Sequence, residues 1–115
     1  MKFTKLYTGA DNKSYFEDID AGVGTDEILG QYSKEYSAKH FMFRDTVAGA
    51  FFDWHTAPRK QYLVYLTGEV EVVASGGEKR LFKAGDVLLA ADLTGEGHTS
   101  RILTSGKSLV IVAAD

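Results

Sequence analysis

The chain has 115 residues, with 13 basic and 16 acidic side chains and no Cys. A chain of this length buries one core, and the absence of Cys excludes disulfides and thiolate chemistry. The basic residues are scattered and no apolar run approaches the roughly 18 residues that span a bilayer, so we expect neither nucleic acid nor a membrane as partner. The N-terminal stretch lacks the apolar core of a secretory signal, which makes the cytoplasm the expected location.

The first third of the chain is the least regular. Turn signals stand at Asp11–Ser14 and at Gly22–Thr25. Thr25 is followed by two acidic residues, a pattern that predicts a short helical turn ending near Gly30. We expect residues 1–37 to form an N-terminal arm or edge strand on a single domain whose core is residues 38–115.

From Ala38 onward the pattern is that of strands and turns. Residues 69–74 alternate with the period of two that a half-buried strand shows, and Ser75–Glu78 reads as a hairpin turn. The predicted strands cover residues 39–44, 47–55, 61–66, 69–74, 79–82, 87–91, 98–103 and 108–113. Many short strands with frequent turns predict an all-β sandwich or barrel.

The stretch from Gly49 to Gly68 reads GAFFDWHTAPRKQYLVYLTG. Its spacing resembles the first motif of the cupin family, in which two Gly enclose a His-x-His pair and a Glu. Gly49, His55 and Gly68 match the motif, whereas Ala57 stands at the second His position and Gln61 at the Glu position. The scaffold residues are therefore kept while the metal-ligand set is degenerate.

The stretch from Lys83 to Ile102 resembles the second cupin motif less closely. Its opening Gly85-Asp86 turn is typical, and His98 takes the role of the motif's His. Ala91 and Leu93 replace a Pro and a Gly, Ile102 replaces an Asn, and the loop is about two residues longer. The resemblance, to small single-domain cupins, covers roughly the last two-thirds of the chain and implies a double-stranded β-helix, or jelly-roll barrel.

The resemblance also implies a site at the barrel mouth. Alternate residues of a strand share a face, so His55 and Ala57 point the same way, and the cupin register would bring Gln61 and His98 to them. Metal-binding cupins hold three His and one Glu at these four positions. With two imidazoles and an amide, one hypothesis is a metal-dependent, oxygenase-like cupin, in which His55, Gln61 and His98 hold a divalent transition metal (Fe, Zn, Ni, Cu or Mn).

A second hypothesis is catalysis without a metal, by His55, Gln61 and His98. Paired imidazoles transfer protons near neutral pH, and the Gln61 amide donates to a developing oxyanion. This suits an isomerase, lyase or cyclase acting next to a carbonyl group, and other cupins catalyse metal-independent sugar epimerisation at the same place. A third hypothesis is a non-catalytic module that binds a small molecule, so whether the chain is an enzyme stays open at the level of the sequence.

Further residues are candidates for substrate binding. Arg44 and His40 share one face of a strand, and a guanidinium binds carboxylates, although a surface ion pair is the alternative for Arg44. Tyr65 shares the face of Gln61, so it either presents its hydroxyl to the pocket or packs in the core. Asp53 has the same parity as His55 and is a candidate to orient it.

Small single-domain cupins commonly dimerise, often through the N-terminal arm. The first third of this chain carries apolar side chains for such a contact, at Tyr7, Tyr15, Phe16 and Ile19. Covering an open sheet edge is a physical reason for it. We therefore expect a homodimer that binds a small-molecule ligand.

Overall fold

The computed structural model describes residues 1–22 and 24–115, which form β-strands and no helix. The all-β class predicted from the sequence is confirmed. A helix long and apolar enough to cross a membrane is not found in the described part of the chain. The strands are β1 (Lys2–Thr8), β2 (Ser14–Asp20), β3 (Asp26–Glu27), β4 (Gly30–Gln31), β5 (Ala38–Thr46), β6 (Phe51–His55), β7 (Gln61–Ala74), β8 (Lys79–Phe82), β9 (Val87–Ala91) and β10 (His98–Ala113).

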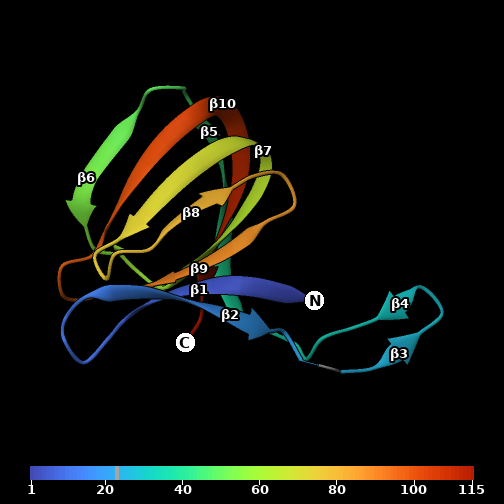
Figure 1. Cartoon of the computed structure of the whole chain (residues 1–115). Helices are drawn as coiled ribbons and strands as arrows, with labels where there is room; N and C mark the ends of the chain where they lie inside the picture. The colour runs from blue at the N-terminus through green and yellow to red at the C-terminus, as the bar shows by residue number, and fades with distance from the viewer. Residues whose placement is uncertain (23) are drawn as a thin grey trace.

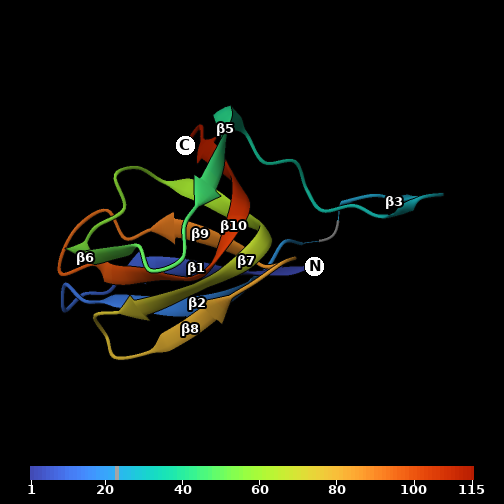
Figure 2. The ribbon, with the colours of Figure 1, turned by 90° about the horizontal axis from the view of Figure 1, so that it is seen from above.

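Two long strands, β7 and β10, pair along their length and organise the barrel (Figure 1). The first half of β7 pairs with β9 and its second half with β8, while β10 pairs first with β6 and then with β5. Each long strand therefore belongs to both layers of the barrel, which Figure 2 shows from above. This is the arrangement expected of a jelly-roll barrel.

The sequence predicted two strands in place of each long one, because turn residues interrupt both apolar patterns. The structure corrects this: β7 continues through Gly68 and β10 through Gly106. A Cβ on Gly68 would lie 2.8 Å from Cα of Gly106, so the two backbones touch where the strands bend. Glycine is needed here for close approach at a barrel corner, and the chain does not reverse.

The N-terminal segment is a larger part of the barrel than the sequence indicated. β1 pairs in parallel with β9 and antiparallel with β2, so residues 1–20 extend the main sheet. Leu6 is fully buried and packs with Phe16 in the main core. β2 is the edge strand of the main sheet, and residues 24–37 lead through the β3–β4 hairpin to β5.

The helical turn predicted at Thr25 is wrong. β3 and β4 form a two-stranded hairpin that extends away from the barrel (Figure 1). The backbone N–H of Tyr32 donates to the carbonyl of Thr25 at 2.8 Å and thereby continues the ladder. A helix of one turn has too few hydrogen bonds to offset its nucleation cost, whereas the hairpin pairs its backbone across the strands. Gly30, at φ +145°, follows the turn.

The sheet made by β2, β1, β9 and the first half of β7 buries apolar side chains on both faces. Leu63 and Leu88 lie on the inner face, in the main core of the barrel. Phe3, Leu89 and Ala21 form a second, smaller core on the outer face, with Tyr62 packed against it. Because side chains alternate along a strand, neighbours such as Gln61 and Tyr62 serve opposite faces.

Candidate functional site

His55 and His98 lie directly opposite each other on neighbouring strands. His55 ends β6, His98 begins β10, and the two are Cα partners in the antiparallel ladder. Side chains of opposed residues share a face, so the register brings the imidazoles together. Their ring centroids are 4.3 Å apart, and Phe52 stacks on His55 with a centroid distance of 3.6 Å.

Gly97 allows this close approach. It has φ +76°, and a Cβ at this position would overlap the backbone carbonyl of His55. The same residue accepts a 3.1 Å hydrogen bond from the backbone N–H of Ser75 through its carbonyl. Only glycine fits between the end of β6 and the loop that leads into β10, so Gly97 helps to set the separation of the two histidines.

Asp92 contacts the Nδ1 side of the His98 ring and was not identified from the sequence. Its side chain is fully buried, and Oδ2 lies 2.6 Å from Nδ1 of His98. The hydroxyl of Ser14, on β2, donates to the same oxygen at 2.7 Å. A carboxylate beside Nδ1 holds the proton on that nitrogen, which leaves Nε2 of His98 free.

His55 is oriented in a different way. Its Nδ1 lies 2.7 Å from the backbone carbonyl of Asp53, so the carbonyl rather than the carboxylate of Asp53 orients the ring. The Asp53 carboxylate instead accepts from the backbone N–H of Trp54 at 2.9 Å. Burial, together with the neighbouring His98, lowers the pKa of His55 below its ordinary value of 6.5. His55 is therefore neutral at physiological pH, and its Nδ1–H donates to the carbonyl oxygen of Asp53.

Both histidines line a cavity of about 520 Å³ at the mouth of the barrel. Gln61, Ala57 and Arg44 line the same cavity. Oε1 of Gln61 is buried and has no hydrogen-bond partner among the described residues. A buried acceptor without a donor is costly, so a donor or cation that reached this oxygen would bind favourably.

Arg44 contributes the positive charge of this cavity. Its Nε donates to Oγ of Ser108 at 3.0 Å, which fixes the side chain and leaves the terminal nitrogens of the guanidinium available. The surface ion pair considered from the sequence is not present among the described residues' salt bridges. Arg44 is thus placed to bind an anionic group of a ligand.

Two predicted substrate-binding residues lie elsewhere. Tyr65 is 2% exposed and stacks on Phe82 in the main core, where burial raises the pKa of its hydroxyl. His40 is exposed and borders a shallow apolar depression beside Phe41 and Phe43, away from the cavity. Strand parity predicts a face but no position along the strand: Tyr65 lies further along β7 than Gln61, in the core, and His40 lies near the start of β5, away from the cavity.

The sequence offered only a weak signal for Asp92 and none for Ser14. Asp92 is an acidic residue directly after a strongly apolar strand and six positions before His98. Ser14 belongs to the N-terminal segment, which the family motifs do not cover. Its contact with Asp92 depends on β1 and β2 joining the barrel.

No protein-family model matches the sequence, and no curated protein matches it either. Among solved structures, this chain is similar to an RmlC-like cupin protein from Desulfovibrio desulfuricans (26% identity, 69% of this chain and 80% of the other, TM-score 0.49). It is also similar to a conserved protein of unknown function from Streptococcus pyogenes, with 14% identity, 84% of this chain and 86% of the other covered, and a TM-score of 0.54. A protein from Neisseria meningitidis is similar as well, with 20% identity, 69% of this chain and 81% of the other covered, and a TM-score of 0.50. The chain has the cupin fold. The topology of β7 and β10 and the convergence of the motif positions agree with it.

The cavity offers few donor atoms to a metal ion. Among the residues that the structure describes, no cluster of three or more His, Cys, Asp or Glu could hold a metal ion. Ala57 lines the cavity without a donor atom, and Gln61 offers a neutral oxygen. The two imidazoles and the amide of Gln61 would give a cation at most three donors, one of them a neutral oxygen, which makes a weak site.

Proposed function

We propose that this cupin is an acid–base enzyme, of isomerase, lyase or cyclase type, that acts on a small metabolite with a carbonyl and a carboxylate group. The observation that carries the proposal is the pairing of two differently supported imidazoles in one cavity. Nδ1 of His98 contacts the buried Asp92 carboxylate, whereas Nδ1 of His55 contacts a neutral backbone carbonyl, and the pKa of His55 is lowered. Two titratable groups in contrasting environments are the usual arrangement of an acid and a base.

The hydrogen-bond partners of the two imidazoles assign a role to each residue of the cavity. Neutral His55 takes a proton from the carbon next to the substrate carbonyl through Nε2. The amide N–H of Gln61 donates to the oxygen on which the enolate charge develops. His98 takes up a proton from solvent on Nε2, and the Asp92 carboxylate balances the resulting charge. His98 then gives this proton to the enolate or to a leaving group, and His55 releases the proton that it took to solvent. Arg44 binds the substrate carboxylate and so orients the reacting carbon.

Solvent deuterium exchange tests this proposal before the natural substrate is known. EDTA-treated protein would be incubated in D₂O with 2-oxobutanoate and acetoacetate, and loss of the proton next to the carbonyl followed by NMR. We expect exchange above the buffer rate that is lost in His55→Gln and His98→Gln, with Arg59→Gln as a control that leaves it unchanged. The methyl ester of 2-oxobutanoate should exchange more slowly, because it lacks the anion for Arg44.

Equal exchange in the His variants and the native chain would contradict the proposal. Saturable binding of either acid without exchange would instead indicate the third hypothesis, a binding module, which ligand-dependent stabilisation against heat would report.

A metal-dependent activity is the second candidate, and one observation favours it. Each imidazole uses Nδ1 for a carbonyl or a carboxylate, which is how proteins orient histidine ligands, and Oε1 of Gln61 lacks a donor. His55, His98 and Gln61 would hold the ion, which would act as a Lewis acid towards the substrate carbonyl. Metal analysis of untagged protein tests this: a near-stoichiometric transition metal that disappears in the His55→Ala/His98→Ala variant would support it.

A further inference from the structure

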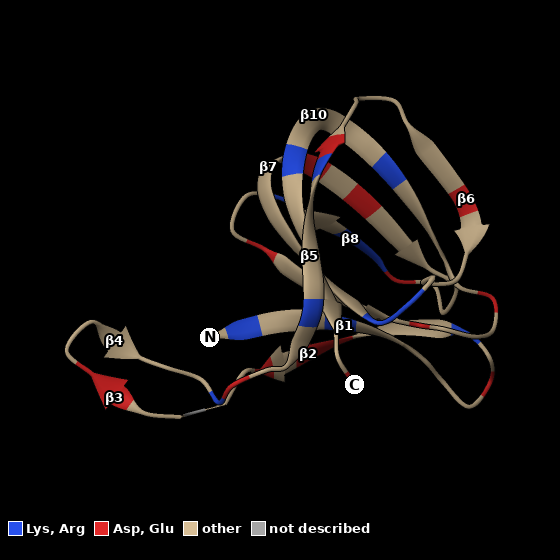
Figure 3. Ribbon diagram, turned by 180° about the vertical axis from the view of Figure 1, so that it is seen from behind, with Lys and Arg blue, Asp and Glu red and all other residues tan. Residues whose placement is uncertain are grey.

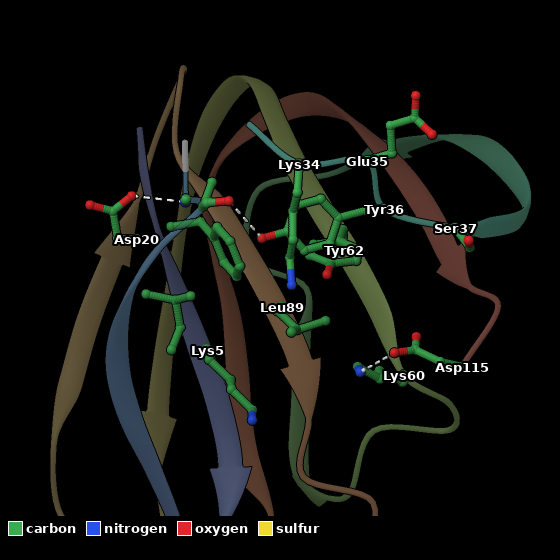
Figure 4. A pocket seen from close by; sticks show the side chains of 14 residues that line it. Lys5, Asp20, Lys34, Glu35, Tyr36, Ser37, Lys60, Tyr62, Leu89 and Asp115 are labelled. Carbon is green, nitrogen blue, oxygen red and sulfur yellow. Dashed lines mark hydrogen bonds and ion pairs between the residues drawn. The ribbon is translucent and has the colours of Figure 1, made fainter. Parts of the chain in front are cut away.

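A second cavity, of about 580 Å³, lies on the outer face of the sheet, opposite to the histidine cavity. Its floor is the outer face of β1, β9 and β7, and its far wall is the segment 34–37 that leads from the hairpin to β5 (Figure 4). The hydroxyl of Tyr36 donates to the carbonyl of Ala21 at 3.0 Å and so holds this segment over the sheet. The cavity is therefore built by a tethered segment and a rigid sheet.

Aromatic rings form one side of this outer cavity. Phe3, Tyr36 and Tyr62 pack edge to face in a triangle, with centroid distances of 6.4, 5.7 and 6.1 Å. Leu89 completes the apolar surface, as Figure 4 shows. Such a surface favours a flat apolar body, which packs against ring edges and faces.

Lysines surround the same surface. In Figure 4 the ammonium group of Lys34 extends towards Leu89, whereas the side chain of Lys5 runs along β1, with its ammonium 6.0 Å from the ring centroid of Tyr7 at the edge of the cavity. Lys34 lies 5.1 Å from the ring centroid of Tyr36, and neither lysine makes a salt bridge within the described residues. Lys60 also lines the cavity and is paired with Asp115 at 3.1 Å.

The other carboxylates of this cavity point away from its centre. In Figure 4 Glu35 is directed to solvent, and Asp20 turns outward, where its Oδ1 accepts from the backbone N–H of Gly22 at 2.9 Å. The cavity thus combines two unpaired cations with an apolar aromatic wall. A ligand that satisfies both has a negative group on a planar apolar body.

We propose that the outer cavity is a second ligand site, which binds a small planar carboxylate with its ring against Tyr36 and Tyr62 and its carboxylate at the ammonium of Lys34, with Lys5 as a second positive charge at the edge of the cavity. The site is independent of the proposed catalysis. The two cavities lie back to back across the same strands, because Tyr62 and Leu89 face the outer one while Gln61 and Ala90 face the inner one. A full sheet layer separates the two ligands.

The test uses 2-naphthoate as the probe and two-dimensional NMR of the full chain as the readout. We expect saturable shifts centred on the amides of Tyr36, Tyr62 and Leu89, and weaker binding of the neutral isostere 2-naphthalenemethanol. The Lys5→Gln/Lys34→Gln variant should raise the Kd by about tenfold or more, the effect of losing two partly desolvated charges. Lys79→Gln/Lys107→Gln is the matched control with the same change in net charge, and it should leave the Kd unchanged.

The His55→Gln variant separates this site from the histidine cavity. Naphthoate binding that survives this variant supports the outer site, whether or not the catalytic proposal holds. The proposal is overturned if the shifts centre on the histidine cavity and vanish in His55→Gln. It is equally overturned if the alcohol binds as well as the acid, if the two double-lysine variants bind alike, or if no saturable shift appears at the outer cavity.

Discussion

Oδ2 of Asp92 lies 2.6 Å from Nδ1 of His98, and the same oxygen accepts the hydroxyl of Ser14. This contact joins three parts of the chain that are far apart in the sequence: β2, the loop after β9, and the start of β10. The carboxylate fixes the tautomer of one imidazole, and the opposed ladder position of His55 supplies the other. The chemistry proposed here depends on that asymmetry.

The free energy of unfolding should depend on pH through His55. Its pKa is lowered in the folded state by burial, so below about pH 6.5 the unfolded chain binds the proton more readily than the folded one. The contribution of His55 to the free energy of unfolding is therefore constant above the pKa that it has in the unfolded chain. As the pH falls from there towards the lower pKa of the folded state, His55 increasingly lowers the free energy of unfolding. Urea unfolding at several pH values, compared with His55→Gln, should show a smaller loss of stability on acidification in the variant. Identical pH profiles would contradict this.

Gly97→Ala should disrupt the site more than an ordinary glycine substitution does. The alanine would have to adopt a positive φ, which costs about 1–2 kcal/mol, and its Cβ would overlap the carbonyl of His55, which adds about 1–3 kcal/mol. Gly85→Ala is the control, because Gly85 has φ +94° and open space around its Cβ position. In urea unfolding, the free energy of unfolding of Gly97→Ala should be well below that of Gly85→Ala. An equal loss of stability in the two variants would show that Gly97 does not set the spacing of the histidines.

Gln61→Glu should create a stronger metal site. The variant places a carboxylate beside two imidazoles, a donor set that Zn²⁺ and Ni²⁺ bind much better than a neutral amide. Isothermal titration with Zn²⁺ should give an affinity at least about tenfold above that of the native chain, on the scale on which metal-site changes act. Glu69→Gln, on the same strand, is a control that should not alter the affinity. An unchanged Zn²⁺ affinity in Gln61→Glu would show that Gln61 does not face the two imidazoles as the cavity suggests.

The homodimer stays a prediction, and the structure indicates where to test it. Ile28 is 100% and Leu29 87% exposed at the tip of the β3–β4 hairpin, which extends from the barrel with its acidic β3 strand (Figure 3). Exposed apolar side chains at such a tip are suited to a partner surface. Light scattering should give a dimer for the native chain and a monomer for Ile28→Ser/Leu29→Ser, with Leu81→Ser as the control. A native monomer at micromolar concentration would contradict the prediction.

The fold was largely predictable because local patterns and global arrangement agree. The period-two alternation of residues 69–74 and the turn at Ser75–Glu78 correspond to the end of β7 and its hairpin with β8. The splitting of β7 and of β10 into two predicted strands each has one physical origin. Gly68 and Gly106 signal close contact of two backbones as readily as a turn, and only the partner strand decides between them.

The residues of the site were predictable where their positions depend on the alternation within one strand or on the register between two neighbouring strands. His55, Gln61, His98 and Arg44 line one cavity, because motif spacing encodes the register of the barrel. Asp92 and the outer cavity were not predictable, because they depend on how β1, β2 and the segment 34–37 cover the sheet. Tyr65 was misplaced because parity gives a face of the strand and not a position along it.

The protonation of the two imidazoles tests the central claim most directly. Nitrogen-detected NMR of metal-free protein with ¹⁵N-labelled histidine distinguishes Nδ1–H from Nε2–H in each ring, and needs no substrate. We predict that Nδ1 of His55 and of His98 carries a proton throughout the range from about pH 5 to pH 8, since each faces an acceptor, Asp53 O and Asp92 Oδ2. Neutral rings protonated at Nε2, with Nδ1 bare, would leave no free Nε2 for proton transfer and would contradict the account.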